Sequence, residues 1–157
     1  MFDVPVDGWY AWLGVAAASV AVLVVVLGLP TAPPPDAAGA ANVVDRIAVT
    51  EYGASAEHPL DAASEVRLTP RGIALRNDAG ETDATFVYGP VTPVPVGGPL
   101  RRVLDGTPPG TVFDTLVAFR RAAATARDRQ ADWRPVDGRL IVRHVVLGGT
   151  DVTLVSA

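Results

Sequence analysis

The chain has 157 residues, a formal net charge of −4 and no cysteine. Without cysteine it forms neither a disulfide framework nor a thiolate site, and its acidic balance gives no long-range attraction to nucleic acid. About 120 residues remain after the apolar first part and its flank, which is enough for one domain with its own core but not for two.

The stretch Trp9–Leu29 contains no charged side chain. A bilayer core about 30 Å thick needs roughly 20 apolar residues in a helix, and a backbone in lipid must satisfy its own hydrogen bonds. Trp9, Tyr10 and Trp12 crowd its start, as amphipathic rings do at a headgroup boundary. The pattern predicts a single-pass transmembrane helix that contacts membrane lipid through Trp9–Leu29.

Two alternatives to an anchor fit the sequence less well. A cleaved secretory signal wants a basic start, where this chain has Asp3 and Asp7, and its candidate cleavage site Thr31-Ala32 precedes a proline. A pilin subunit carries one continuous helix behind a basic processing site, and the prolines from Pro30 onward interrupt the helix. The anchor is therefore the favoured interpretation.

The orientation in the membrane is set by few residues. No Lys or Arg precedes the span, and the first to follow it is Arg46, so the positive-inside rule leaves both orientations open. Pro30 and Pro33–Pro35 predict a semi-rigid polyproline spacer, which favours an exported domain on the extracytoplasmic side. The expected organisation is a tail and transmembrane helix at 1–29, a Pro-rich linker at 30–35, and an α+β domain at 36–157.

The domain is predicted to have two layers, with two helices on a mostly antiparallel sheet of about six strands. Asp36 is a predicted N-cap for a helix from Ala37 to about Ala56, whose polar face includes Asp45. A capping box at Thr111–Asp114 predicts a second helix, to about Gln130. Alternation and turn residues predict strands at 66–68, 73–76, 82–88, 133–136, 139–147 and 151–155, a helical turn at 100–105, and an edge strand or loop at 89–99. The order also allows a duplicated αβββ unit.

No catalytic, cofactor-binding or metal-ligating residues are predicted, and no cofactor. His58 is expected in a surface loop and His144 on a half-exposed strand face, and their spacing does not indicate a metal site. The serines form no nucleophile elbow, and the Gly-Gly pairs lack the lysine of a phosphate-binding loop. The sequence therefore predicts a protein that is not an enzyme.

Two further features have both a binding and a structural interpretation. The cations Arg101, Arg102, Arg120, Arg121, Arg127 and Arg129 form either a patch for anionic lipid or another polyanion, or an ordinary solvated face. Trp133 is either a ligand platform or a core or rim residue beside a strand.

All thirteen cationic residues are Arg, and Asp outnumbers Glu, a composition that resembles proteins of salt-loving archaea; GC-biased codon usage is the alternative explanation. The segments MFDVPVDGWYAWLG, GLPTAPPPDAA and VRLTPRGIALRNDAG resemble an uncharacterised family of small single-span membrane proteins of halophilic archaea. The resemblance covers the whole chain. It implies membrane residence and no known activity, and some such families accompany pilus or secretion machinery.

The expected function is that of a membrane-anchored, non-enzymatic structural or interaction protein of the cell envelope, with a protein partner and no nucleic acid. The alternative is a membrane-tethered ligand-binding or sensory module, which a sizeable apolar pocket with convergent polar groups near Trp133 would favour. An enzyme would require His58 or His144 within hydrogen-bond reach of carboxylates.

Overall fold

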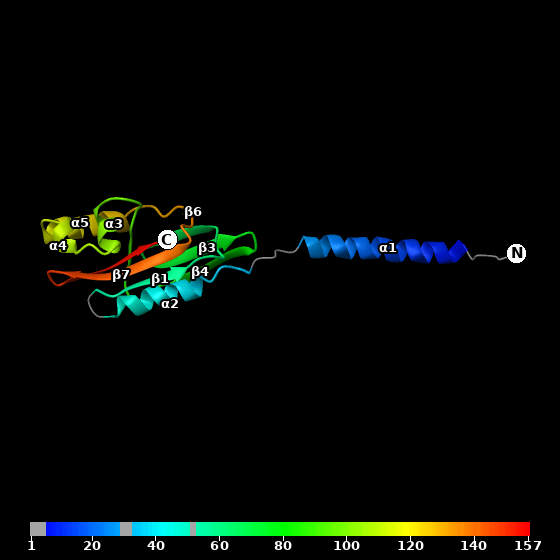
Figure 1. The fold of residues 1–157 in the computed structure, drawn as a ribbon, viewed down its shortest axis with the longest axis horizontal. Helices are drawn as coiled ribbons and strands as arrows, with labels where there is room; N and C mark the ends of the chain where they lie inside the picture. Colours follow the sequence, from blue (N-terminus) through cyan, green and yellow to red (C-terminus); the bar gives the residue numbers. More distant parts are fainter. Residues whose placement is uncertain (1–5, 29–32, 51–52) are drawn as a thin grey trace. The chain divides into compact units, whose positions relative to one another are not determined.

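The computed structural model describes residues 6–28, 33–50 and 53–157 (Figure 1). The chain divides into two units, Met1–Thr31 and Ala32–Ala157. The predicted positions of Leu29, Pro30 and Tyr52 lie outside the described residues, as does the tail before Val6.

The first unit contains one long apolar helix, α1 (Val6–Leu27). Its segment Trp9–Leu27 has the length and composition of a membrane span or a signal sequence, and its side chains are exposed. The only hydroxyl within this segment outside the aromatic cluster belongs to Ser19, which donates to the carbonyl of Val15 at 2.8 Å. The helix thus satisfies that polar group internally, as a helix in lipid must.

The second unit is an α+β domain, as predicted. Its described residues form eight strands in two four-stranded sheets: sheet 1, in the order β1-β7-β8-β5, and sheet 2, in the order β4-β3-β2-β6. Every pairing is antiparallel except β5 with β8. The strands are β1 (Ser55–Pro59), β2 (Glu65–Thr69), β3 (Gly72–Asn77), β4 (Gly80–Thr85), β5 (Thr92–Pro93), β6 (Arg134–Pro135), β7 (Arg139–Leu147) and β8 (Thr150–Ser156); the helices are α2 (Ala37–Ala48), α3 (Pro99–Leu104), α4 (Pro109–Val112) and α5 (Leu116–Arg127).

The division into two sheets differs from the predicted single sheet of about six strands. Strand β1 occupies the end of the predicted first helix, which stops at Ala48, and Gly53 turns the chain with a φ of +83°. Strand β1 pairs with β7, and β6 pairs with β2, so each sheet takes strands from both halves of the domain. The fold is therefore not two successive αβββ units.

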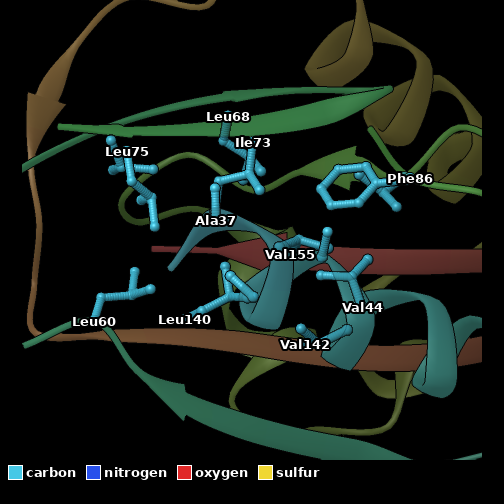
Figure 2. Packing of buried hydrophobic residues seen from close by; sticks show 14 of the residues in the cluster. Ala37, Val44, Leu60, Leu68, Ile73, Leu75, Phe86, Leu140, Val142 and Val155 are labelled. Atoms are coloured by element: carbon cyan, nitrogen blue, oxygen red, sulfur yellow. The ribbon is translucent and has the colours of Figure 1, made fainter. Parts of the chain in front are cut away.

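A first core lies between α2 and the two sheets (Figure 2). The predicted N-cap is confirmed: Asp36 accepts from the amide of Gly39 at 2.8 Å. The apolar face of α2 combines small residues with Val44 and Ile47, and alanine lets a helix approach a sheet closely. It packs against buried side chains of both sheets, among them Leu75, Leu140 and Val142.

A second core covers the opposite face of sheet 1. Along β7, Leu140 and Val142 enter the first core, while Val145 packs in the second with α3 and α5. Figure 1 shows α2 on one side of β7 and the helices α3, α4 and α5 on the other. Sheet 1 is thus buried on both faces, and the domain has more than two layers.

The predicted capping box at Thr111–Asp114 is wrong. The N-cap of α5 is Thr115, whose hydroxyl oxygen accepts from the amide of Ala118 at 3.1 Å. Thr111 instead donates to the carbonyl of Pro108 within the separate turn α4. Phe113 interrupts the helix because its backbone is extended, which brings its ring edge-to-face onto that of Phe119, with 5.4 Å between ring centroids.

Part of the predicted Pro-rich linker is hydrogen-bonded to the β3–β4 hairpin. The carbonyl of Pro33 accepts from the side-chain amide of Asn77, and that of Pro35 from the hydroxyl of Thr82, both at 2.8 Å. Proline has no N–H to donate, but its carbonyl remains a full acceptor. These two bonds hold the entry to α2 against sheet 2.

Candidate functional site

Both histidines lie on neighbouring strands of sheet 1, and both expectations about their surroundings are corrected. His58 is on β1 and not in a loop, because residues 55–59 pair with β7. His144 is only 8% exposed, with Nδ1 3.4 Å from the hydroxyl oxygen of Thr153 on β8. In the described part of the chain, no three His, Cys, Asp or Glu residues are grouped closely enough to hold a metal ion.

Asp45 is a buried carboxylate that sequence reasoning placed on the polar face of its helix. It is 9% exposed, and one of its oxygens accepts from the amides of Val87 and Tyr88 at 2.9 and 3.1 Å. These partners follow β4 and lie more than forty residues away in sequence. No local pattern could therefore have revealed this link between α2 and the segment after β4.

Replacing Asp45 with alanine is expected to lower the free energy of unfolding by about 2 kcal/mol, because both amides lose a charged acceptor. The variant Asp45→Asn keeps the oxygen without its charge, so we expect about half that loss. Chemical denaturation of wild type and both variants measures the difference. Equal losses of stability in the two variants would show that the charge of Asp45, and not the position of its oxygen, stabilises this link.

Trp133 lies on the outer face of sheet 2, half-buried, within a group of charged side chains. The guanidinium carbons of Arg67 and Arg76 are 4.7 and 4.4 Å from its ring centroid. Arg67 in turn pairs with Glu81 at 3.4 Å, and Arg76 with Glu65 at 2.5 Å. Trp133 is thus a rim residue that interacts with the domain's own arginines.

The hydrogen bond and charge of Arg76 hold the pKa of Glu65 below its ordinary value, and Glu65 raises the pKa of Arg76. A depressed carboxyl pKa stabilises the fold above the unfolded pKa of about 4.3, and this stability is lost as the pH falls through the folded pKa. We therefore expect Glu65→Gln to destabilise the domain at pH 6 and to converge on wild type at pH 3. Denaturation midpoints at the two pH values check this, and Arg76→Gln should remove the same pH dependence.

Three arginines of the predicted patch are bound within the domain. Arg101 pairs with Asp105 at 2.9 Å and donates to Ser156, while Arg120 donates to Thr150. Arg127 donates to the hydroxyl of Thr92 at 2.8 Å, and burial lowers its pKa. The guanidinium groups of these three arginines hold α3 and α5 against sheet 1. The three arginines therefore do not present a common surface to a polyanion.

Arg121 and Arg129 instead line a groove beside α5. One cavity of about 560 Å³ lies between α5, the loop 95–98 and the start of α3, and a second of about 250 Å³ lies between β2, residues 93–95 and the end of α5. The two cavities share Pro95, Ala126 and Arg129 in their linings and therefore adjoin each other; together they are called the α5 groove. Most of its floor is apolar.

The far end of the α5 groove holds Arg134, next to Trp133 in sequence. Its side chain is half-buried, and desolvation lowers its pKa. Sequence reasoning missed this residue; it predicted an edge strand or loop at 89–99, but not that part of this segment forms one wall of the groove. The only local signal was Gly97-Gly98, whose φ angles of +76° and +85° produce the turn before α3.

A family model matches residues 3–145 of the chain; its description is a family of unknown function, DUF7283. The chain belongs to DUF7283. The matched range of this DUF7283 protein includes α1 and every residue that lines the α5 groove. Neither a curated protein nor a solved structure matches it.

Proposed function

We propose that this DUF7283 protein is a membrane-anchored, non-enzymatic structural or interaction protein of the cell envelope. The observation that carries the proposal is the Trp9–Leu27 segment of α1, which is exposed, uncharged, apolar and of membrane length, and which precedes a domain with its own two cores. A helix with this composition is costly to leave in water, since each exposed apolar side chain costs about 1–3 kcal/mol. In the proposal, Trp9–Leu27 is a single-pass anchor.

The finer assignments belong to the same proposal. The Pro-rich segment after the span supports an extracytoplasmic domain, and the Lys-free, Asp-rich composition supports a halophilic archaeal host. Dense carboxylates keep a surface hydrated when salt has reduced the Debye length to a few Å. A place beside pilus or secretion machinery fits an anchored domain whose partner is another protein.

The test is chemical crosslinking in native membranes at high salt, followed by purification of the tagged full-length chain. We expect one or a few proteins to be recovered reproducibly with the tagged chain and not with an unrelated single-span protein. Recovery of no reproducible partner in either crosslinked or uncrosslinked membranes would contradict the proposal. Protease protection in right-side-out and inverted vesicles tests the extracytoplasmic orientation separately.

A membrane-tethered ligand-binding module is the second candidate. The observation that favours it is the smaller cavity of the α5 groove, where Arg129, Gln130 and Arg134 converge over an apolar floor. A small molecule bound there should raise the melting temperature of the full-length protein in detergent. A partner protein that competes with such a molecule would show that the two functions use the same site.

A further inference from the structure

We infer that the α5 groove is the docking site for an extended, acidic segment with apolar side chains, supplied by a partner protein. The inference deepens the proposed function and rests on it. It is carried by the charge of the groove, by the shape and chemistry of its floor, and by the sheet edges that flank it.

The groove carries positive charge on a protein that is acidic as a whole. Its lining includes Arg121, Arg129 and Arg134, against a single carboxylate, that of Asp132. None of the three arginines has an ion pair with another described residue, although most other arginines on these elements are bound within the domain. Carboxylates of an incoming chain are the complementary charge, and guanidinium groups bind them with fixed geometry.

The floor of the groove favours a polypeptide over an anionic membrane surface. It is concave and lined by Leu100, Ala118, Ala122 and the prolines of the 93–99 segment. Val96, in its wall, is 88% exposed. An anionic bilayer surface is recognised by clusters of four or more exposed cations next to the membrane, whereas a concave apolar floor accepts single side chains.

The flanking strands exclude recognition by strand addition. Strand β5 is the edge of sheet 1, and β6 is the edge of sheet 2. Each is two residues long and contains a proline, Pro93 or Pro135, which offers no backbone N–H. The docking segment is therefore held by its side chains and not by a ladder of backbone hydrogen bonds.

The spacing of the arginines defines the segment. Arg121 lies on α5, and Arg129 lies two residues after the helix ends at Arg127. The six residue steps within the helix span about 9 Å along its axis, and the two steps beyond it extend the separation to roughly 12 Å. An extended chain covers that distance in about four residues, and its positions i, i+2 and i+4 point to the same side. The expected pattern is thus acidic–x–apolar–x–acidic, with the apolar side chain on the floor between the two arginines.

The test uses the full-length protein in nanodiscs of neutral lipid, at a salt concentration where circular dichroism shows it folded. An array of random ten-residue peptides is screened against wild type and against Ala118→Trp, which fills the groove from an exposed helix position. We expect the peptides that bind wild type alone to be enriched in the acidic–x–apolar–x–acidic pattern. No such peptides, or peptides that are neutral or basic, would overturn the inference.

The selected peptides are then measured by fluorescence anisotropy. The double variant Arg121→Gln/Arg129→Gln should raise their Kd at least tenfold, while Arg102→Gln, which removes an exposed charge outside the groove, should change it less than twofold. Equal effects would overturn the inference. Binding of a short-chain anionic lipid in place of the peptides, abolished by the same double variant, would also overturn the inference.

Failure here is distinguishable from failure of the proposed function. If crosslinking in native membranes recovers the same partner with Ala118→Trp as with wild type, the protein remains an interaction protein and only the docking site is wrong. If no partner is recovered with either chain, the proposed function itself fails.

Discussion

Replacing Phe119 with alanine is expected to lower the free energy of unfolding by about 3–5 kcal/mol. Phe119 is fully buried, packs edge-to-face on Phe113 and is the largest fully buried side chain among the described residues of the domain. Its removal costs the transfer free energy of the ring and leaves a cavity between α5 and sheet 1. Chemical denaturation of the full-length protein in detergent, followed by circular dichroism, measures the loss.

Val117 offers a matched control on the same helix, because it is 66% exposed. Val117→Ala is expected to change stability by less than about 0.5 kcal/mol, as exposed substitutions usually do. A loss below about 1 kcal/mol in Phe119→Ala would mean that α5 is not fixed to sheet 1 by its aromatic side chain. The second core would then be a weaker cluster than its burial indicates.

The double substitution Ala17→Arg/Val20→Arg is expected to abolish membrane association. Both positions lie in the middle of the Trp9–Leu27 segment. An arginine at the centre of a transmembrane helix costs about 2.5–3.5 kcal/mol, so two cost about 5–7 kcal/mol. At about 1.4 kcal/mol per factor of ten, insertion becomes roughly 10⁴-fold less favourable. Ultracentrifugation of lysates without detergent should move the variant from the membrane pellet to the supernatant.

The volume-matched apolar variant Ala17→Leu/Val20→Leu should remain in the pellet. Wild-type protein that stays in the supernatant would contradict the membrane anchor, as would an arginine variant that stays in the pellet. The intact mass of the mature wild-type chain separates an anchor from a signal sequence, since only a signal sequence is removed. A mature chain that lacks α1 would show that the protein is released from the membrane and not anchored in it.

Features with a local sequence signal were predictable. The apolar run identified α1, Asp36 marked the start of α2, and the strand predicted at 139–147 coincides with β7. In each case the decisive interaction lies within a few residues: helical hydrogen bonds, a cap three residues away, or alternation along one strand. The α+β class follows from the same signals.

Features that depend on distant pairing were not predictable. Strand β1 is a polar pentapeptide that becomes a strand by pairing with β7, more than eighty residues later. The strand predicted at 133–136 contains β6, and the edge strand or loop predicted at 89–99 contains β5, but the sheet that each joins depends on a distant partner strand. The groove itself joins side chains of β2, α5 and two loops, and no single stretch of sequence contains its pattern.

The position of β7 determines how the domain unfolds. Strand β7 supplies Leu140 and Val142 to the first core and Val145 to the second. The packing of the two cores is therefore coupled through β7, and displacement of this strand disrupts both. The domain should therefore melt as one cooperative unit, with a calorimetric enthalpy equal to the van't Hoff enthalpy. Hydrogen exchange at the amides of β7 should then occur only through global opening, which makes this strand the slowest-exchanging part of the molecule.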